Sequence, residues 1–309
     1  MRVLVIGAGA LGGYYGACLA RAGADVTFLV RPARAEQLRR NGLQIVSPHG
    51  DFAVQPKLIL ADDLKQTFDV VLVGVKSYSL DDAMTQFAPA VGSGTMILPI
   101  LNGLKHIDAL VTRFGAGAVL GGLANISAAL DPEGRVVQLW PNQLIMFGEV
   151  KGGASERALA LQSLLQGAGV DARASDAVMH DMWEKFVQLS TIAGITCMMR
   201  ASIGDILAVP NGEQSIFRLF GECCAVATAS GFEPRPPFIE FDRGLFTTVN
   251  SPIKASMLRD IERGSVTEGE HILGDMAARA RTLGIETPVL DLARAHVAAY
   301  EIGRQKAVG

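Results

Sequence analysis

Cysteine is scarce in this sequence: 309 residues contain four, Cys18, Cys197, Cys223 and Cys224. Their spacing matches neither a metal site nor a disulfide framework, and the adjacent pair falls inside a helical pattern. We therefore expect small buried hydrophobic residues in a reducing compartment, and no bound metal.

A strong charge of either sign and a long apolar run are also lacking. The formal net charge is −3, and without a block of like charges there is no electrostatic basis for binding nucleic acid. No segment approaches the ~20 consecutive apolar residues that span a bilayer. The first residues lead directly into a core strand, without the pattern of an export signal. We expect a cytoplasmic protein that binds neither nucleic acid nor a membrane.

Apolar residues make up 49% of the chain, which over 309 residues is enough for two domains with separate cores. In the first half, short apolar runs alternate with helical patterns, as is typical of a parallel sheet covered by helices. The expected strands are residues 3–6, 25–30, 43–46, 69–74, 95–100, 118–120, 136–140, 144–147 and 170–173. Residues 141–143 are expected to form the turn of a hairpin.

Beyond residue 175, long helical patterns predominate. They cover residues 177–199, 213–230, 251–262, 267–283 and 290–302, and the proline-rich segment 231–237 is expected to be a loop. The sequence therefore predicts an α/β domain over residues 1–174 and an all-α domain over residues 175–309. We expect a ligand-binding cleft between them.

The most informative motif is a G-x-G-x-x-G pattern between an apolar strand and a helix. In a dinucleotide site, Gly7 permits a tight turn, Gly9 lets the backbone approach the pyrophosphate, and Gly12 lets the helix pack on the strand. The helix N-terminus also attracts phosphate. A glycine-rich turn without a ligand is the alternative. We predict a Rossmann-type domain whose cofactor loop consists of Gly7, Ala8, Gly9, Ala10, Leu11 and Gly12.

The second expected strand, residues 25–30, is followed by a basic residue, Arg31. Sites for NAD usually carry Asp or Glu there, whereas this chain has Arg31, and Asp25 lies too early because it opens the strand. A guanidinium can bind the 2′-phosphate of NADP through charge-assisted hydrogen bonds. A solvated basic residue near a helix start is the alternative. The predicted cofactor is NADP(H).

Reduction of a carbonyl by NADPH needs a proton donor and groups that hold the substrate. Lys185 is flanked by Trp183 and Phe186, so burial could lower its pKa, although spacing alone favours a surface lysine whose stem lies on apolar atoms. Glu268 ends a pattern, Ser265 to Glu268, that favours a helix capping box. A carboxylate that binds substrate is the second interpretation.

Three further polar residues lie where a ligand could reach them. Asn102 follows an expected strand at the carboxyl edge of the sheet, where ligands bind, but a turn or helix cap is equally consistent. Lys76 lies at the same edge and could reach the adenosine phosphate. Ser256 lies on a helix face and by itself indicates nothing.

In combination, these residues resemble the ketopantoate reductase (2-dehydropantoate 2-reductase) family along essentially the whole chain. The matching motifs follow the family's order and spacing: the glycine loop, Arg31, Lys76, Asn102-Gly103, Trp183-Glu184-Lys185, the segment 256–261, Thr267-Glu268, Gly274 and the segment 284–288. The resemblance implies NADPH-dependent reduction of a 2-oxo acid to the 2-hydroxy acid. Ketopantoate, reduced to pantoate in pantothenate biosynthesis, is the first candidate substrate.

The resemblance also implies individual roles. Lys185 would protonate the substrate oxygen, and Glu268 would orient the substrate hydroxyl and the lysine ammonium. Asn102 would position the carbonyl side of the substrate next to the cofactor, and Ser256 would help to hold the carboxylate. Arg31 and Lys76 would bind the phosphorylated ribose.

Two positions depart from the family pattern. The family has asparagines four and eight residues after the lysine, where this chain has Leu189 and Ala193. A buried unpaired polar group costs ~1–3 kcal/mol, which shifts specificity roughly ten- to hundred-fold. A more apolar 2-oxo acid, in contact with Leu189 and Ala193, is therefore the alternative substrate.

Two questions stay open at this point. A non-catalytic NADPH sensor is the alternative from another functional class, although a sensor has no need of Lys185 and Glu268 together. An apolar face of the helical domain could pair with a second copy in a homodimer, or it could serve the chain's own core.

Overall fold

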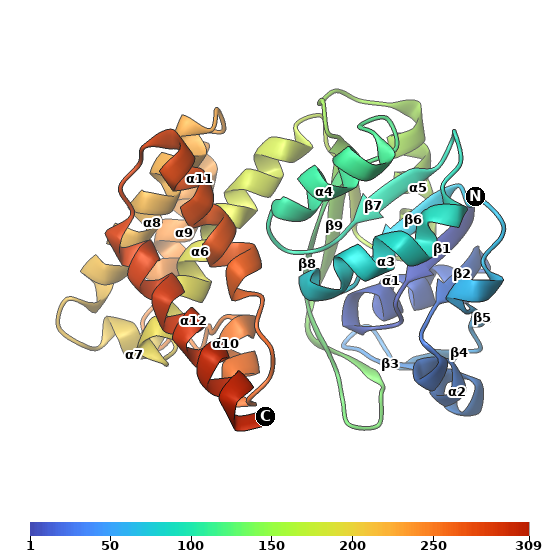
Figure 1. Cartoon of the computed structure of the whole chain (residues 1–309), viewed down its shortest axis with the longest axis horizontal. Coiled ribbons are helices and arrows are strands. Elements are labelled where there is room, and N and C mark those ends of the chain that lie inside the picture. Colours follow the sequence, from blue (N-terminus) through green and yellow to red (C-terminus); the bar gives the residue numbers. More distant parts are fainter. Residues whose placement is uncertain (309) are drawn as a thin grey trace. The chain divides into compact units, whose positions relative to one another are not determined.

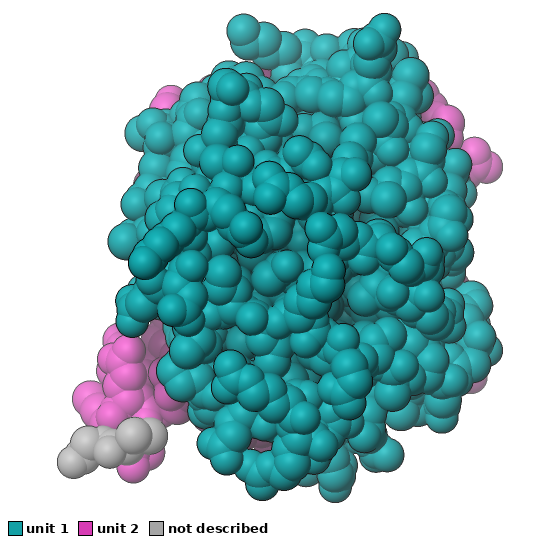
Figure 2. Space-filling view, turned by 90° about the vertical axis from the view of Figure 1, so that its right-hand side faces the viewer, with its two compact units in different colours: residues 1–101, 106–179 teal, residues 102–105, 180–309 magenta. Residues whose placement is uncertain are grey.

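The structure, a computed structural model, describes residues 1–308 and divides into two compact units (Figures 1 and 2). The first unit comprises residues 1–101 and 106–179, and the second comprises residues 102–105 and those from 180 onward. The division lies inside a helix, a few residues after the predicted boundary at residue 174. The short segment 102–105 joins the second unit although it follows a strand of the first.

A five-stranded parallel sheet forms the centre of the first unit, in the order β5-β2-β1-β6-β7. The strands are β1 (Arg2–Ile6), β2 (Asp25–Leu29), β5 (Lys57–Ile59), β6 (Val70–Val73) and β7 (Met96–Pro99). Along β1, Val3 and Val5 enter one hydrophobic core while Leu4 and Ile6 enter the other. Because both faces are buried, the strand is apolar at successive positions.

Helices cover both faces of this sheet. They are α1 (Ala10–Arg21), α2 (Pro32–Asn41), α3 (Leu80–Phe87), α4 (Lys105–Phe114) and α5 (Glu156–Gly167), with 3₁₀ turns η1 (Ala61–Asp63), η2 (Ser77–Ser79) and η3 (Ala88–Ala90). Residues of α1 and α5 belong to the core on the Val3 face, and residues of α3 and α4 belong to the core on the Leu4 face. The strand order and the two helical layers confirm the predicted Rossmann-type fold.

A second sheet packs in the core on the α1 side. Its order is β10-β9-β3-β4, and β8 pairs with β9. The strands are β3 (Leu43–Val46), β4 (Phe52–Val54), β8 (Leu120–Leu130), β9 (Val136–Glu149) and β10 (Ala172–Ala174). The three-residue strands β4 and β5 escaped prediction because they are too short to show an alternating pattern.

The predicted hairpin turn at residues 141–143 is wrong. Those residues lie inside the continuous strand β9, whose antiparallel partner is β8, and the turn is formed by Asp131–Arg135 with Gly134 at φ 81°. The pairing register shifts between Ile126 and Ala128, so β9 has extra residues there and Pro141 falls in the irregular stretch. A proline at a bulge removes no hydrogen bond from the ladder.

The second unit is helical, which confirms the second half of the fold prediction. Its elements are α6 (Val178–Met199), α7 (Ile203–Leu207), α8 (Gly212–Ala229), α9 (Pro236–Phe246), α10 (Ser256–Glu262), the π-helical turn η4 (Glu270–Gly274), α11 (Asp275–Leu283) and α12 (Pro288–Val308). The expected loop at 231–237 ends two residues early, at residue 235, because Pro236 is the first residue of α9. Proline is accommodated in the first turn of a helix.

The cysteines are free: Cys18, Cys197 and Cys223 are buried, and Cys224 is half-buried. Over residues 1–308, no helix is long and apolar enough to cross a membrane. In the same described part of the chain, no group of three or more His, Cys, Asp or Glu side chains is placed to hold a metal ion.

Candidate active site

The glycine loop has the backbone conformation that its sequence predicted. Gly7 has φ 83°, and its N–H donates to the carbonyl of Leu29 at 3.0 Å. A Cβ on Gly12 would lie 2.4 Å from the carbonyl oxygen of Gly7, whereas a Cβ on Gly9 would have no described atom within 4 Å. Gly7 and Gly12 are thus required by the loop itself, and the open space at Gly9 fits the approach of a pyrophosphate.

The end of β6 lies against this loop. A Cβ on Gly74 would lie 2.8 Å from the nitrogen of Gly12, and Val75 Cγ1 lies 3.3 Å from a Cβ built on Gly7. Lys76 comes next and is exposed. Because β1 and β6 are adjacent parallel strands, their carboxyl ends bring the glycine loop and Lys76 to the same edge of the sheet.

Arg31 lies at the N-terminus of α2, with its side chain 69% exposed, and forms an ion pair with Asp82 of α3 at 3.3 Å. An ion pair this exposed contributes ~0–1 kcal/mol, so it does not prevent the guanidinium from binding an anion. Arg34 on the same helix instead donates hydrogen bonds to the carbonyl oxygen of Ala8 in the glycine loop. Sequence reasoning missed this second arginine, because its partner is a backbone atom.

In the second unit, Lys185 lies in the middle part of α6 and is half-buried. Desolvation lowers the pKa of its ammonium group to about 8. This burial favours the proton-donor interpretation of Lys185 over that of an exposed surface lysine.

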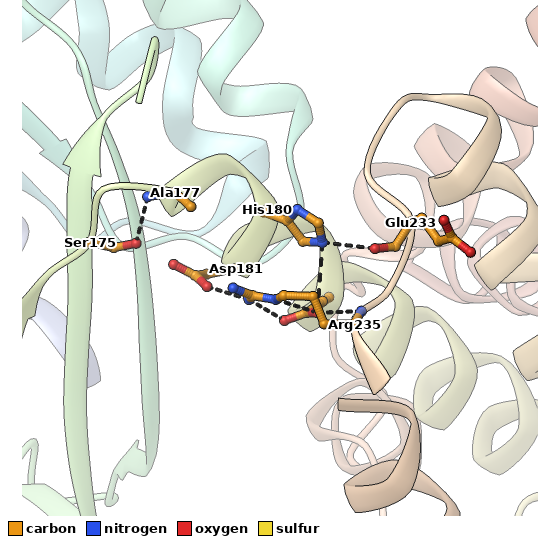
Figure 3. A network of polar contacts seen from close by, with 7 residues as sticks. Ser175, Ala177, His180, Asp181, Glu233 and Arg235 are labelled. Carbon is orange, nitrogen blue, oxygen red and sulfur yellow. Dashed lines mark hydrogen bonds and ion pairs between the residues drawn. The ribbon is translucent and has the colours of Figure 1, made fainter. Parts of the chain in front are cut away.

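Figure 3 shows a network of polar contacts between the first part of α6 and the segment that precedes α9. Arg235 donates to Glu184 from its backbone N–H and from Nε, at 2.9 and 2.8 Å, and its Nη2 contacts both Glu184 and Asp181 at 2.5 Å. His180 hydrogen-bonds the carbonyl of Glu233 at 2.8 Å. The buried Glu184, which precedes Lys185 in the chain, thus links α6 to the segment before α9 through its hydrogen bonds with Arg235.

The predicted capping box at Ser265 and Glu268 is not formed. The helix begins at Gly269, and the hydroxyl of Thr267 accepts from the Gly269 N–H at 3.3 Å. A Cβ on Gly269 would lie 2.5 Å from the side chain of Val297, so α12 approaches the chain closely here. Glu268 is half-buried and lies two residues before the π-helical turn η4, and its backbone carbonyl accepts hydrogen bonds from the N–H groups of His271 and Ile272.

His271 connects two of the predicted site residues, and sequence reasoning did not find it. Its ring hydrogen-bonds the backbone of Asn102 and lies 3.3 Å from a Cβ built on Gly103. Desolvation lowers the pKa of His271, while the nearby Glu268 carboxylate opposes that shift. This packing explains why the segment 102–105 belongs to the second unit, and His271 thus interacts with both Asn102 and Glu268. The one feature of the sequence that could have indicated His271 is its position three residues after Glu268, because residues at this spacing lie on the same side of a helix.

Ser256 is the exposed first residue of α10. The N–H of Ala255, just before it, donates to Thr196 Oγ1 on α6 at 3.3 Å. Thr196 is eleven residues after Lys185, which is three turns and roughly 16 Å along the same side of the helix. Between Lys185 and Thr196 on this helix, Leu189 is half-buried and Ala193 is buried.

Comparison with known proteins decides the family. A family model described as ketopantoate reductase PanE/ApbA matches residues 3–152, and the model of that family's C-terminal domain matches residues 177–301. The chain belongs to the ketopantoate reductase family. Membership in this family makes it an oxidoreductase that acts on a CH–OH group.

Relatives of the chain in this family match over nearly their full length. The uncharacterised oxidoreductase YkpB of Bacillus subtilis is 38% identical over 301 residues, 97% of this chain and 99% of that protein. The crystal structure of a 2-dehydropantoate 2-reductase from Geobacter metallireducens has 31% identity and a TM-score of 0.88, covering 97% of this chain and 99% of its own. A D-mandelate dehydrogenase solved with NADH and anilino(oxo)acetate, at 21% identity, TM-score 0.87 and coverage of 99% and 100%, shares the fold.

Proposed function

We propose that the protein reduces a 2-oxo acid to the 2-hydroxy acid with NADPH, and that ketopantoate is the first candidate substrate. The observation that carries this proposal is the half-buried Lys185, whose pKa of about 8 suits a general acid. At pH 7 such a lysine is protonated, yet it gives up its proton more readily than an exposed lysine would.

The proposed roles fall into two groups, cofactor binding and the reaction with the substrate. The glycine loop, Arg31 and Lys76 would hold the dinucleotide, which supplies a hydride to the carbonyl carbon when bound. Lys185 Nζ donates a proton to the carbonyl oxygen, so that the C=O bond becomes CH–OH, and the lysine regains its proton from solvent. Glu268 orients the hydroxyl group, while Asn102 and Ser256 hold the carbonyl side and the carboxylate.

NADPH rather than NADH is supported by the end of β2. The strand ends without a carboxylate to accept hydrogen bonds from the ribose hydroxyls, and the largely exposed Arg31 follows it. Asp82 neutralises part of this charge in the unliganded chain, and a 2′-phosphate would take its place as the partner of the guanidinium.

A second candidate, a more apolar 2-oxo acid, is favoured by the surface of α6. Lys185, Leu189, Ile192 and Thr196 follow one another at helical spacing on one side of the helix. Lys185 would contact the substrate carbonyl, and Thr196 lies near Ser256, which would contact the carboxylate. The two residues between them in this stripe, Leu189 and Ile192, are apolar. The D-mandelate dehydrogenase that shares this fold is named for an aromatic 2-hydroxy acid, which supports the second candidate.

Steady-state oxidation of NADPH and NADH against a panel of 2-oxo acids tests the proposal. The panel should contain ketopantoate, 2-oxoisovalerate, 2-oxo-4-methylpentanoate and phenylglyoxylate, which differ in side-chain polarity and size. We expect turnover with NADPH and the highest kcat/KM for ketopantoate. A preference of more than about a hundredfold for an apolar acid would replace ketopantoate by the second candidate. No turnover with any acid would reject the activity.

A further inference from the structure

Arg34 joins the glycine loop to a turn about a hundred residues away. Its Nε and Nη2 both donate to the carbonyl oxygen of Ala8, at 3.2 and 2.9 Å. Its Nη1 donates to the carbonyl oxygen of Gly134 at 2.9 Å and to Gln37 Oε1 at 2.5 Å. The side chain is half-buried, and although burial lowers its pKa, a guanidinium stays charged at neutral pH.

The two hydrogen bonds from Arg34 to the carbonyl oxygen of Ala8 determine the direction of the N–H group of Gly9, the next residue. In a planar trans peptide, the C=O and N–H bonds point in opposite directions. With the Ala8 oxygen held by two donors of Arg34, the N–H of Gly9 must point away from the arginine. Of the three motif glycines Gly7, Gly9 and Gly12, Gly9 is the one at which an added Cβ would have no described atom within 4 Å.

We propose that Arg34 is a positioning residue for the dinucleotide: it holds the Ala8–Gly9 peptide so that the Gly9 N–H is directed at the pyrophosphate. This inference rests on the proposed dinucleotide site and adds a residue that acts through the backbone rather than by touching the ligand. A charged hydrogen bond to a carbonyl is stronger than a neutral one, so the peptide is held in this orientation before the ligand arrives.

Arg31 and Arg34 therefore have different tasks. All three nitrogens of the Arg34 guanidinium donate to protein oxygens, whereas the Arg31 side chain is 69% exposed and contacts only the carboxylate side chain of Asp82 among the bonds described. Arg31 is the residue suited to a 2′-phosphate, which NADH lacks. Replacement of Arg34 would weaken the binding of NADPH and NADH to the same extent, because both cofactors carry the pyrophosphate.

Gly134 provides an independent way to disturb the same contact. It has φ 81°, and a Cβ there would lie 2.2 Å from Gln37 Nε2 and 2.7 Å from Arg34 Nη1. The variant Gly134→Ala should therefore displace the Arg34 guanidinium although no residue of the glycine loop or of α2 is substituted. Arg39, an exposed arginine on the same helix, offers a matched control.

The experiment compares dissociation constants of NADPH, NADH and adenosine 2′-monophosphate, which carries the 2′-phosphate but no pyrophosphate. For Arg34→Ala and Gly134→Ala, we expect NADPH and NADH to weaken by the same factor, about tenfold or more, and adenosine 2′-monophosphate to change less than about twofold. Arg34→Lys, which keeps the charge but not the fork, should fall between wild type and Arg34→Ala. Arg39→Ala should bind all three as wild type does.

Other outcomes are distinct from these. Loss of NADPH and adenosine 2′-monophosphate affinity with NADH unchanged would make Arg34 a 2′-phosphate ligand and overturn the inference. Unchanged affinities together with a lower Tm would reduce Arg34 to a structural role and overturn it as well. If the wild-type chain binds neither NADPH nor NADH, the proposed function itself fails, whatever the variants do.

Discussion

Gln188 of α6 donates a 2.5 Å hydrogen bond to Oδ1 of Asp242 on α9, and Asp242 is fully buried. Within the described part of the chain, its Oδ2 has no hydrogen-bond partner. Desolvation raises the pKa of Asp242 to about 7; the hydrogen bond from Gln188 opposes this shift, and the nearby Glu184 carboxylate adds to it. A carboxyl group that is substantially protonated at neutral pH therefore lies beside the helix that carries Lys185.

Stability should depend on pH through Asp242. An unfolded Asp titrates near pH 4, so between about pH 4 and pH 7 the folded chain binds more protons than the unfolded chain. The free energy of unfolding therefore falls as pH rises through this window. Asp242→Asn removes the titration, so its free energy of unfolding relative to wild type should rise between pH 4 and pH 8, by up to ~4 kcal/mol.

Urea unfolding of both proteins across this pH range measures the difference, in which the titrating groups that do not interact with Asp242 cancel. A difference between Asp242→Asn and wild type that stays constant from pH 4 to pH 8 would contradict the raised pKa.

The rate of reduction should fall above about pH 8, because Lys185 must be protonated to act as the acid. Below that pH the lysine is charged, and kcat/KM should be independent of its titration. Lys185→Ala should lower kcat by several powers of ten and leave the dissociation constant of NADPH nearly unchanged. If turnover survives this change, Lys185 is not the proton donor, and the sensor hypothesis regains support.

Cofactor preference should depend on Arg31. Arg31→Ala should weaken NADPH roughly ten- to hundred-fold and NADH by less than about twofold, since only NADPH has the phosphate that a guanidinium binds. Asp82→Asn, which removes the present partner of Arg31, should tighten NADPH by a few-fold at low salt. Titrations of the two cofactors check both variants. Equal losses for NADPH and NADH in Arg31→Ala would remove the case for a 2′-phosphate site.

Substrate preference should depend on the apolar stripe of α6. Leu189→Asn restores a hydrogen-bonding group one turn after Lys185, and it should raise kcat/KM for ketopantoate relative to 2-oxo-4-methylpentanoate by about tenfold. Leu189→Met keeps the volume and the apolar character, so it should leave the ratio near that of wild type. The same ratio for both variants would show that position 189 does not contact the substrate.

Elements with a long, strong pattern were predictable. The strand–loop–helix around Gly7, Gly9 and Gly12 lies where the sequence indicates, because steric limits on each glycine are local. The helix that carries Lys185 was predicted over residues 177–199 and is observed as Val178–Met199, since 22 residues contain many repeats of the helical period. The position of Lys185 on that helix was therefore known from the sequence, but its degree of burial was not.

Contacts between distant parts of the chain were not predictable. The continuous strand β9 was predicted as two strands, because Pro141 is a turn signal unless a partner strand with a shifted register accommodates it. The contact of His271 with Asn102 and Gly103 joins positions about 170 residues apart. No local pattern encodes such a pair.

The sequence by itself determined the Rossmann-type fold, the conformation of the glycine loop and the arginine that follows the second strand. These depend on periodicity and on backbone limits that act over a few residues. Only the tertiary structure decided which arginine is exposed and which is bound to the loop, how far the pKa of Lys185 is lowered, and that Asn102 packs with the helices. These properties depend on desolvation and on hydrogen bonds to residues brought close by folding, so they have no signature in the local sequence.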